Sequence, residues 1–313
     1  MPRKIVQLKD GTLLSCRWKI VDSIGYGGYC SIYLVKDGFG KVEAAAKIEE
    51  ATVKPTLQAE VGILLKLKGA RHVLQYLDYG ETDQFRFLIM ELGGPNLSDL
   101  KRFQPTKRFS LSTVLRLGVQ FIEAVQDLHR IGFVHRDIKP CNFVIGREME
   151  NQKLVYLIDF GIARRYARQR DGKLRKPRKH VGFRGTLKYA SPNIHDGKEA
   201  GRQDDLWSVL YAMIDLRYGC LPWHDEGDKA KVGRWKKTIN PVDLLRDFPD
   251  EIYEILETLK CLQYEDKPDY DSFIDKIRKA MSRLGIHENE LYDWQAKKLL
   301  DDKEKTACCF LFR

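Results

Sequence analysis

The chain has 313 residues, of which 43% are hydrophobic and 31% charged, and this composition excludes a disordered protein. No apolar run approaches the roughly 18 residues that a membrane-spanning helix needs, and the first residues lack the apolar stretch of a signal peptide. The net charge of +10 lies in residues 162–188, which contain eleven Lys or Arg residues and one Asp. Because this segment has only two aromatic residues and no nucleic-acid motif, we expect no nucleic acid partner. We therefore expect a cytoplasmic protein, and the same features are compatible with the nucleus.

The first ninety residues have mainly the pattern of β-strands. We expect strands at 17–25, 30–38, 42–50, 72–80 and 85–92, separated by turn residues. One helix is expected at 55–69, where apolar residues recur at helical spacing between Pro55 and Gly69. These elements predict a small mixed lobe over residues 1–92.

The remainder of the chain is predicted to be helical. Helices are expected at 110–132, 203–219, 250–262 and 270–281, which gives a larger lobe over 93–296 with a hinge at the GGPN sequence of 93–96. Residues 297–313 have the composition of a flexible tail. Seven cysteines without metal-ligand spacing indicate free thiols, and the adjacent pair Cys308 and Cys309 does not fit prenylation.

Four motifs carry the chemistry. The glycine-rich turn SIGYGGYCSIY at 23–33 is followed by a strand ending in AAAK, then by FVHRDIKPCNFVIG at 133–146 and by LVYLIDFGIARRY at 154–166. In this order and spacing, the chain resembles the eukaryotic protein kinase family from Ile24 to about Trp294. The resemblance implies an α+β bilobal fold, with a mainly antiparallel β N-lobe containing one helix and a mainly α C-lobe.

The resemblance also implies an ATP site in the N-lobe. Gly25, Gly27 and Gly28 would let the backbone approach the phosphates, and Lys47 would hold the α and β phosphates with its direction fixed by Glu60. Adenine would lie among apolar side chains and form two backbone hydrogen bonds. The residues concerned are Ile24, Ile32, Ala45 and Met90 for the ring, and Glu91 and Leu92 for the backbone bonds.

The catalytic residues are expected in the C-lobe. Asp137 would orient the incoming hydroxyl, Lys139 would neutralise charge on the transferred phosphate, and Thr186 would brace both. Asn142 and Asp159 would supply oxygen ligands for Mg²⁺. Lys139, two residues after Asp137, fits the serine/threonine pattern.

Each of these residues also has a purely structural interpretation. The Lys47–Glu60 pair can be a structural ion pair, His135 a core histidine and Asp159 part of a plain turn. Asp205, which we expect to hold the catalytic loop from below, can be a helix N-cap. Their combination favours catalysis.

One position of the glycine-rich turn departs from the family pattern. Cys30 stands where a third glycine is expected, and we expect a modest effect on nucleotide binding. A second hypothesis makes the Cys30 thiol an oxidisable brake above the phosphates.

Two further features narrow the family. Ser191-Pro192-Asn193 replaces the usual Ala-Pro-Glu, so we expect the usual Glu–Arg bridge to be missing. The motifs HRDIKPCNF, IDFGIARRY, FRGTLKYAS and DDLWS are similar to those of the casein kinase I superfamily, and HVGFRGT, GRQDDLWS, KPDY and YDW bring the chain closest to its tau-tubulin kinase branch, as a divergent member.

The basic segment 162–188 predicts substrate preference and regulation. Its only hydroxyl-bearing side chain before Thr186 is Tyr166, so we expect no activating phosphorylation. Arg178, Arg184 and Lys188 would bind an anion on acidic or pre-phosphorylated protein substrates, including microtubule-associated ones. A monomer is expected. The alternative functions are a pseudokinase scaffold and a basic adaptor for acidic partners such as tubulin tails.

Overall fold

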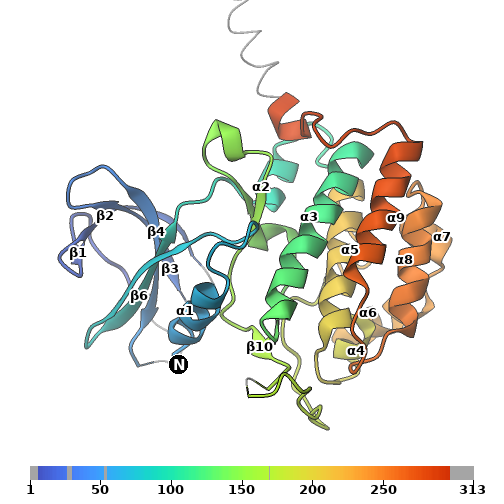
Figure 1. Cartoon of the computed structure of the whole chain (residues 1–313), viewed down its shortest axis with the longest axis horizontal. Coiled ribbons are helices and arrows are strands. Elements are labelled where there is room, and N and C mark those ends of the chain that lie inside the picture. The colour runs from blue at the N-terminus through green and yellow to red at the C-terminus, as the bar shows by residue number, and fades with distance from the viewer. Residues whose placement is uncertain (1–5, 27–29, 53–54, 169, 297–313) are drawn as a thin grey trace, which may run out of the picture.

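The structure is a computed structural model that describes residues 6–26, 30–52, 55–168 and 170–296. Within these residues, the N-terminal lobe contains a six-stranded antiparallel sheet with the strand order β1-β2-β3-β4-β6-β5. The helix α1 (Leu57–Lys66) packs against β5 and β6 on the side facing the C-terminal lobe (Figure 1). The strands are β1 (Leu13–Leu14), β2 (Trp18–Tyr26), β3 (Ser31–Asp37), β4 (Glu43–Glu50), β5 (Tyr76–Glu81) and β6 (Phe85–Glu91).

The strand expected at 72–80 begins later than predicted. Residues 72–75 lie outside β5, and His72 bonds to the C-lobe: its carbonyl accepts from the Leu157 N–H at 2.8 Å, and its ring contacts the Val155 carbonyl. A buried apolar pattern therefore marked an inter-lobe contact and not a sheet strand.

The C-lobe is built around α3 (Leu111–Arg130), which packs against α5 (Arg202–Tyr218) and α9 (Tyr270–Arg283). Figure 1 shows this helical layer on one side of the molecule and the sheet on the other. The remaining helices are α2 (Leu97–Arg102), α4 (Pro192–His195), α6 (Lys229–Thr238), α7 (Pro241–Leu245) and α8 (Asp250–Cys261), with 3₁₀ turns η1 (Pro140–Asn142) and η2 (Met149–Asn151). Two short pairs of strands, β7 (Phe133–Val134) with β10 (Arg164–Arg165) and β8 (Phe143–Ile145) with β9 (Val155–Leu157), carry the functional loops.

The glycines of the hinge are required by close packing between the lobes. A Cβ on Gly93 would lie 2.7 Å from the Val144 side chain, and one on Gly94 would lie 3.0 Å from the Gly146 carbonyl. The Gly94 N–H donates to the Ile145 carbonyl at 2.8 Å. The hinge is thereby anchored to the β8 strand that follows the catalytic loop.

Among the described residues, none of the helices has the length and apolar character needed to cross a bilayer.

Candidate active site

Lys47 pairs with two carboxylates, one in its own lobe and one in the C-lobe. Its Nζ donates to Glu60 Oε2 at 2.7 Å and to Asp159 Oδ1 at 2.8 Å. Burial acts to lower the pKa of Lys47, but the charges of Glu60 and Asp159 outweigh it and raise the pKa, so the side chain stays cationic. The Lys47 charge also holds the pKa of Asp159 at about 2, below its ordinary value of 3.8. A purely structural pair would not need the exposed Asp159 as a third member.

The local folds place these three groups. Lys47 lies on the central strand β4, opposite Ile32, and Glu60 lies in the first turn of α1. Glu60 also accepts the Phe160 N–H at 3.1 Å through its second oxygen. Asp159 has a φ of +67°, a left-handed conformation that turns the chain between β9 and the activation segment.

The catalytic loop forms a second group of three side chains. Thr186 Oγ1 donates to Asp137 Oδ1 at 2.7 Å, while Lys139 Nζ donates to Asp137 Oδ2 at 2.7 Å and to Thr186 Oγ1 at 3.0 Å. Both oxygens of Asp137 are thus oriented by neighbours. The three residues predicted to be catalytic are brought into direct contact.

The predicted metal ligands offer oxygen donors. The Asn142 amide nitrogen donates to the Asp137 carbonyl at 2.8 Å, which leaves its side-chain oxygen as an acceptor, and Asp159 adds a carboxylate. Within the described part of the chain, no cluster of three or more His, Cys, Asp or Glu side chains could hold a metal alone. One carboxylate and one amide fit Mg²⁺, which is usually held by few protein oxygens together with substrate phosphates.

Asp205 holds the catalytic loop, as predicted. Its carboxylate accepts the backbone N–H groups of His135 at 2.7 Å and Arg136 at 2.9 Å, and it contacts the His129 ring at 2.9 Å. Burial acts to raise the pKa of Asp205, but the bond to His129 outweighs it and the pKa is lowered. The N-cap of α5 is Gly201, so the N-cap interpretation of Asp205 is wrong.

The expected adenine positions lie on a partly open face of the sheet. Along β4, Ala45 is half-buried between Ala44 and Ala46, which are fully buried, and Ala45 pairs with half-buried Met90 on β6. Ile24 is 48% exposed. Such alternation fits a cleft better than a closed core. Ile32 and Leu92 are likewise half-buried.

Two details of the expected nucleotide contacts follow from the backbone. The Glu91 N–H donates to the Gln75 carbonyl at 2.9 Å. Of the two backbone groups of Glu91, the carbonyl is therefore the one that can accept a hydrogen bond from a ligand. Gly25 lies in β2 with open space around its Cα, as a phosphate-approaching glycine requires. Gly27 and Gly28 lie outside the described residues, as do Cys308 and Cys309.

Burial counts against the hypothesis of an oxidisable brake at Cys30. The side chain is 6% exposed and lies in the hydrophobic core, where burial raises the pKa of its thiol to about 11. Because the thiolate is the reactive species, the burial and the raised pKa of Cys30 disfavour its reaction at neutral pH.

Arg178 does not join a free anion site, because it pairs with a buried carboxylate. Its guanidinium forms two hydrogen bonds with Glu199, at 2.5 and 3.0 Å, and Arg164 contacts the same carboxylate at 3.1 Å. Glu199 is 6% exposed and needs this compensation. Sequence reasoning missed Glu199, because a lone acidic residue in a loop has no pattern.

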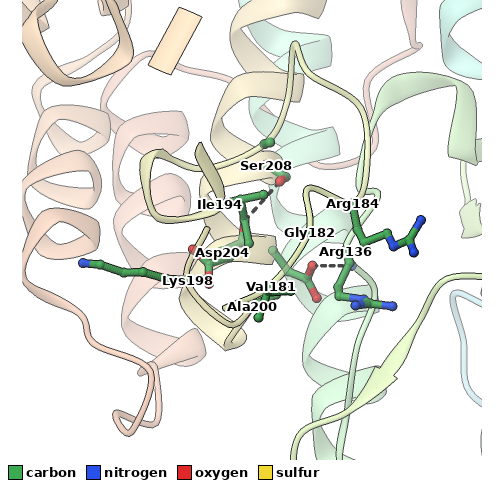
Figure 2. Close-up of a pocket in the computed structure, with 11 residues that line it drawn as sticks. Arg136, Val181, Gly182, Arg184, Ile194, Lys198, Ala200, Asp204 and Ser208 are labelled. Carbon is green, nitrogen blue, oxygen red and sulfur yellow. Dashed lines mark hydrogen bonds between the residues drawn. The ribbon is translucent and has the colours of Figure 1, made fainter. Parts of the chain in front are cut away.

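Arg184 and Lys188 are exposed, and neither forms an ion pair within the described residues. Arg184 and Arg136 line a cavity whose volume of about 20 Å³ suits a single water, not a phosphate. Figure 2 shows the Arg184 and Arg136 side chains extending to the same side and Lys198 to the opposite side. Any anion site on Arg184 and Lys188 is therefore on the surface.

The Ser191-Pro192-Asn193 sequence that replaces Ala-Pro-Glu is held by Asp204. Ser191 caps α4 and donates to Asp204 Oδ1, and Asp204 Oδ2 accepts the Gly201 N–H at 2.7 Å. Burial raises the pKa of Asp204 to about 6. A buried Ser–Asp contact thus fixes the end of the activation segment to α5.

Comparison with known proteins agrees with this geometry. The model of the protein kinase domain matches residues 18–290. A probable serine/threonine-protein kinase of Dictyostelium discoideum is 39% identical over 288 residues, which make up 92% of this chain and 58% of that protein. The serine/threonine-protein kinase spe-6 of Caenorhabditis elegans is 34% identical over 296 residues, 92% of this chain and 78% of the relative. A putative casein kinase I of the same organism is 33% identical over 303 residues, 93% of this chain and 87% of the relative. The chain therefore spans somewhat more than half of the Dictyostelium relative and most of the other two.

A family match over most of the chain, together with the two groups of side chains around Lys47 and Asp137, shows that this chain belongs to the protein kinase family.

Proposed function

We propose that the chain is a serine/threonine kinase that transfers the γ-phosphoryl group of Mg-ATP to protein hydroxyls. The observation that carries the proposal is the preassembled pair of contacts in which Lys47 joins Glu60 to Asp159 and Lys139 joins Asp137 to Thr186. The names of the relatives and Lys139 at its position support serine/threonine specificity.

Each side chain has a defined task in this reaction. Asp137 accepts the hydrogen bond of the substrate hydroxyl, since Thr186 and Lys139 already fix its two oxygens. Lys139 stabilises the negative charge that develops on the transferred group, and Lys47 orients the nucleotide phosphates. Bound Mg²⁺ would neutralise phosphate charge, held by Asp159 and Asn142.

A transfer assay with labelled ATP, Mg²⁺ and casein tests this proposal. The wild-type chain is expected to label casein, and Asp159→Asn, which removes a carboxylate charge without changing shape, is expected to lose labelling. If folded wild-type protein left casein unlabelled, the result would instead support a pseudokinase scaffold. The contacts of Lys47, Asp137 and Asp159 argue against that alternative.

We also propose that the kinase needs no phosphorylation of its activation segment. Tyr166 is 8% exposed, and its hydroxyl donates to the His129 carbonyl at 2.7 Å, so it is protected from an upstream kinase. Arg136 donates to the Ile162 carbonyl through Nε at 2.7 Å. Glu199 neutralises Arg164 and Arg178. In kinases whose activation segment is phosphorylated, the added phosphate can neutralise arginines in this way.

We propose that exposed cations near the site favour acidic or phosphorylated substrates. Lys188 lies two residues after Thr186 and Arg184 two residues before it, so an acidic or phosphorylated group beside the substrate hydroxyl can pair with them. Reversal of both charges is expected to weaken phosphorylation of acidic peptides and to spare neutral ones. Equal effects on both peptides would contradict this preference. We propose membership of the tau-tubulin branch, with acidic tubulin tails or microtubule-associated proteins as the corresponding partners, and a monomeric state.

A further inference from the structure

Four consecutive backbone carbonyls after Thr186 are held by side chains of the C-lobe. The carbonyls of Leu187 and Ala190 accept from Lys236 Nζ at 2.8 and 2.7 Å. That of Lys188 accepts from Trp223 Nε1 at 2.9 Å, and that of Tyr189 from Ser208 Oγ at 2.8 Å. Residues 187–190, here called the 187–190 segment, are thereby fixed at every carbonyl.

The 187–190 segment is directly connected to the catalytic residues. It directly follows Thr186, whose carbonyl accepts the N–H groups of Tyr189 at 3.0 Å and Ala190 at 3.1 Å and whose hydroxyl donates to Asp137. A displacement of the segment would therefore move the brace on Asp137 and the surface beside it.

Lys236 is the most unusual of the side chains that hold this segment. It projects from α6, is 5% exposed, and its Nζ lies 5.0 Å from the ring centres of both Tyr211 and Trp223. Besides the two carbonyls, the Lys236 Nζ has a third polar neighbour, His195 Nε2 at 3.2 Å. Within the described chain, no carboxylate forms an ion pair with Lys236, and burial lowers the pKa of its amine to about 6.

An apolar residue would fill this position at a lower desolvation cost, so packing alone does not account for a lysine. Its donors are used on two carbonyls of one segment, which would otherwise be left without these bonds. The rings of Tyr211 and Trp223 lie against the amine and favour its cationic form, which opposes the effect of burial on its pKa. The neighbouring Lys237, by contrast, is half-exposed and pairs with Asp196.

We propose that Lys236 is a positioning residue that fixes the 187–190 segment for protein-substrate binding and supplies from within the fold the order that phosphorylation supplies in other kinases. The inference rests on the proposed kinase function. It predicts an effect on the protein substrate that is separate from ATP binding.

The test compares the full-length chain with Lys236→Met, whose unbranched side chain ends where the lysine Cε lies and lacks the amine donors. The KM for casein is expected to rise about tenfold or more, while the KM for ATP stays within about twofold of the wild-type value. Hydrogen–deuterium exchange is expected to speed up in the 187–190 segment. Lys237→Met is the matched control, and it should change neither quantity.

A second variant separates positioning from volume. Lys236→Gln has the same reach as Met, one bond less than Lys, but still donates, so it is expected to recover part of the casein KM. Equal defects in the Met and Gln variants, with unchanged exchange, would overturn the proposal. Failure of both variants to fold would also overturn it, because Lys236 would then be a general structural residue. If the wild-type chain transfers no phosphate, the proposed function fails, while the exchange experiment still decides whether Lys236 orders the segment.

Discussion

Replacing Glu199 by Gln removes the charge that holds the basic activation segment. A buried carboxylate that loses its charge next to cations costs about 3–5 kcal/mol, whereas an exposed pair contributes about 0–1 kcal/mol. Glu199 has a side chain only 4% exposed, but Arg178 and Arg164 are 45% and 30% exposed and can be rehydrated. We therefore expect Glu199→Gln to lower the free energy of unfolding by about 2 kcal/mol.

The pH dependence of this effect has a definite sign. Burial acts to raise the pKa of Glu199, but the bonds to Arg178 and the charge of Arg164 outweigh it and lower the pKa below 4.5. The stabilisation is therefore present above pH 4.5 and is lost as the pH falls through the lowered pKa. Wild-type and variant should differ at pH 7 and converge in acid.

Urea unfolding at pH 7 and near pH 4, followed by the casein assay, measures both consequences. Glu257→Gln is a matched control, because Glu257 is exposed and, among the residues that the structure describes, pairs only with Lys260 one turn away. A loss of less than about 0.5 kcal/mol is expected. We expect Glu199→Gln to lose activity as well as stability. An unchanged stability and activity at pH 7 would refute the role given to Glu199.

Three further predictions follow from the same contacts. Tyr166→Phe should lower the free energy of unfolding by about 1 kcal/mol through loss of the bond to the His129 carbonyl, yet keep casein activity; loss of activity with intact folding would show that the hydroxyl is needed for activation. Cys30 should resist iodoacetamide at pH 7.5 in the folded chain, as mapped by mass spectrometry; rapid labelling would contradict its burial. The pKa of Lys236 is lowered from 10.5 to about 6 in the folded state, so between these values the unfolded chain binds more protons there and the wild-type protein gains stability as the pH rises. The stability of Lys236→Met relative to wild type should therefore be greater at pH 6.5 than at pH 9. A constant difference in urea unfolding would count against this.

The sequence was most informative where function depends on local motifs. Asp137, Lys139 and Asn142 lie within one short loop, and their contacts follow from that spacing once the loop folds. The long helices were also predictable, since α3 keeps its apolar periodicity for 20 residues and begins at the N-cap Ser110. Their bounds differ from the prediction by a few residues.

Long-range compensation was not predictable. Arg178 looked like a free cation in a basic run, because its partner Glu199 lies 21 residues away in an unremarkable loop. Cys30 looked exposed in a glycine-rich turn, although the tertiary core encloses it. Lys236 and Lys237 are neighbours in the sequence, and only the packing of α6 under the 187–190 segment gives them different environments.

The most direct test of the central claim is mass spectrometry of casein incubated with Mg-ATP and the purified chain, without any upstream kinase, beside the Asp137→Asn variant. The account predicts phosphoserine or phosphothreonine with the wild-type chain and a loss of at least about a hundredfold with the variant, whose side chain keeps its shape but accepts the hydroxyl proton poorly. Equal phosphorylation by both proteins, or none by a folded wild-type chain, would contradict it.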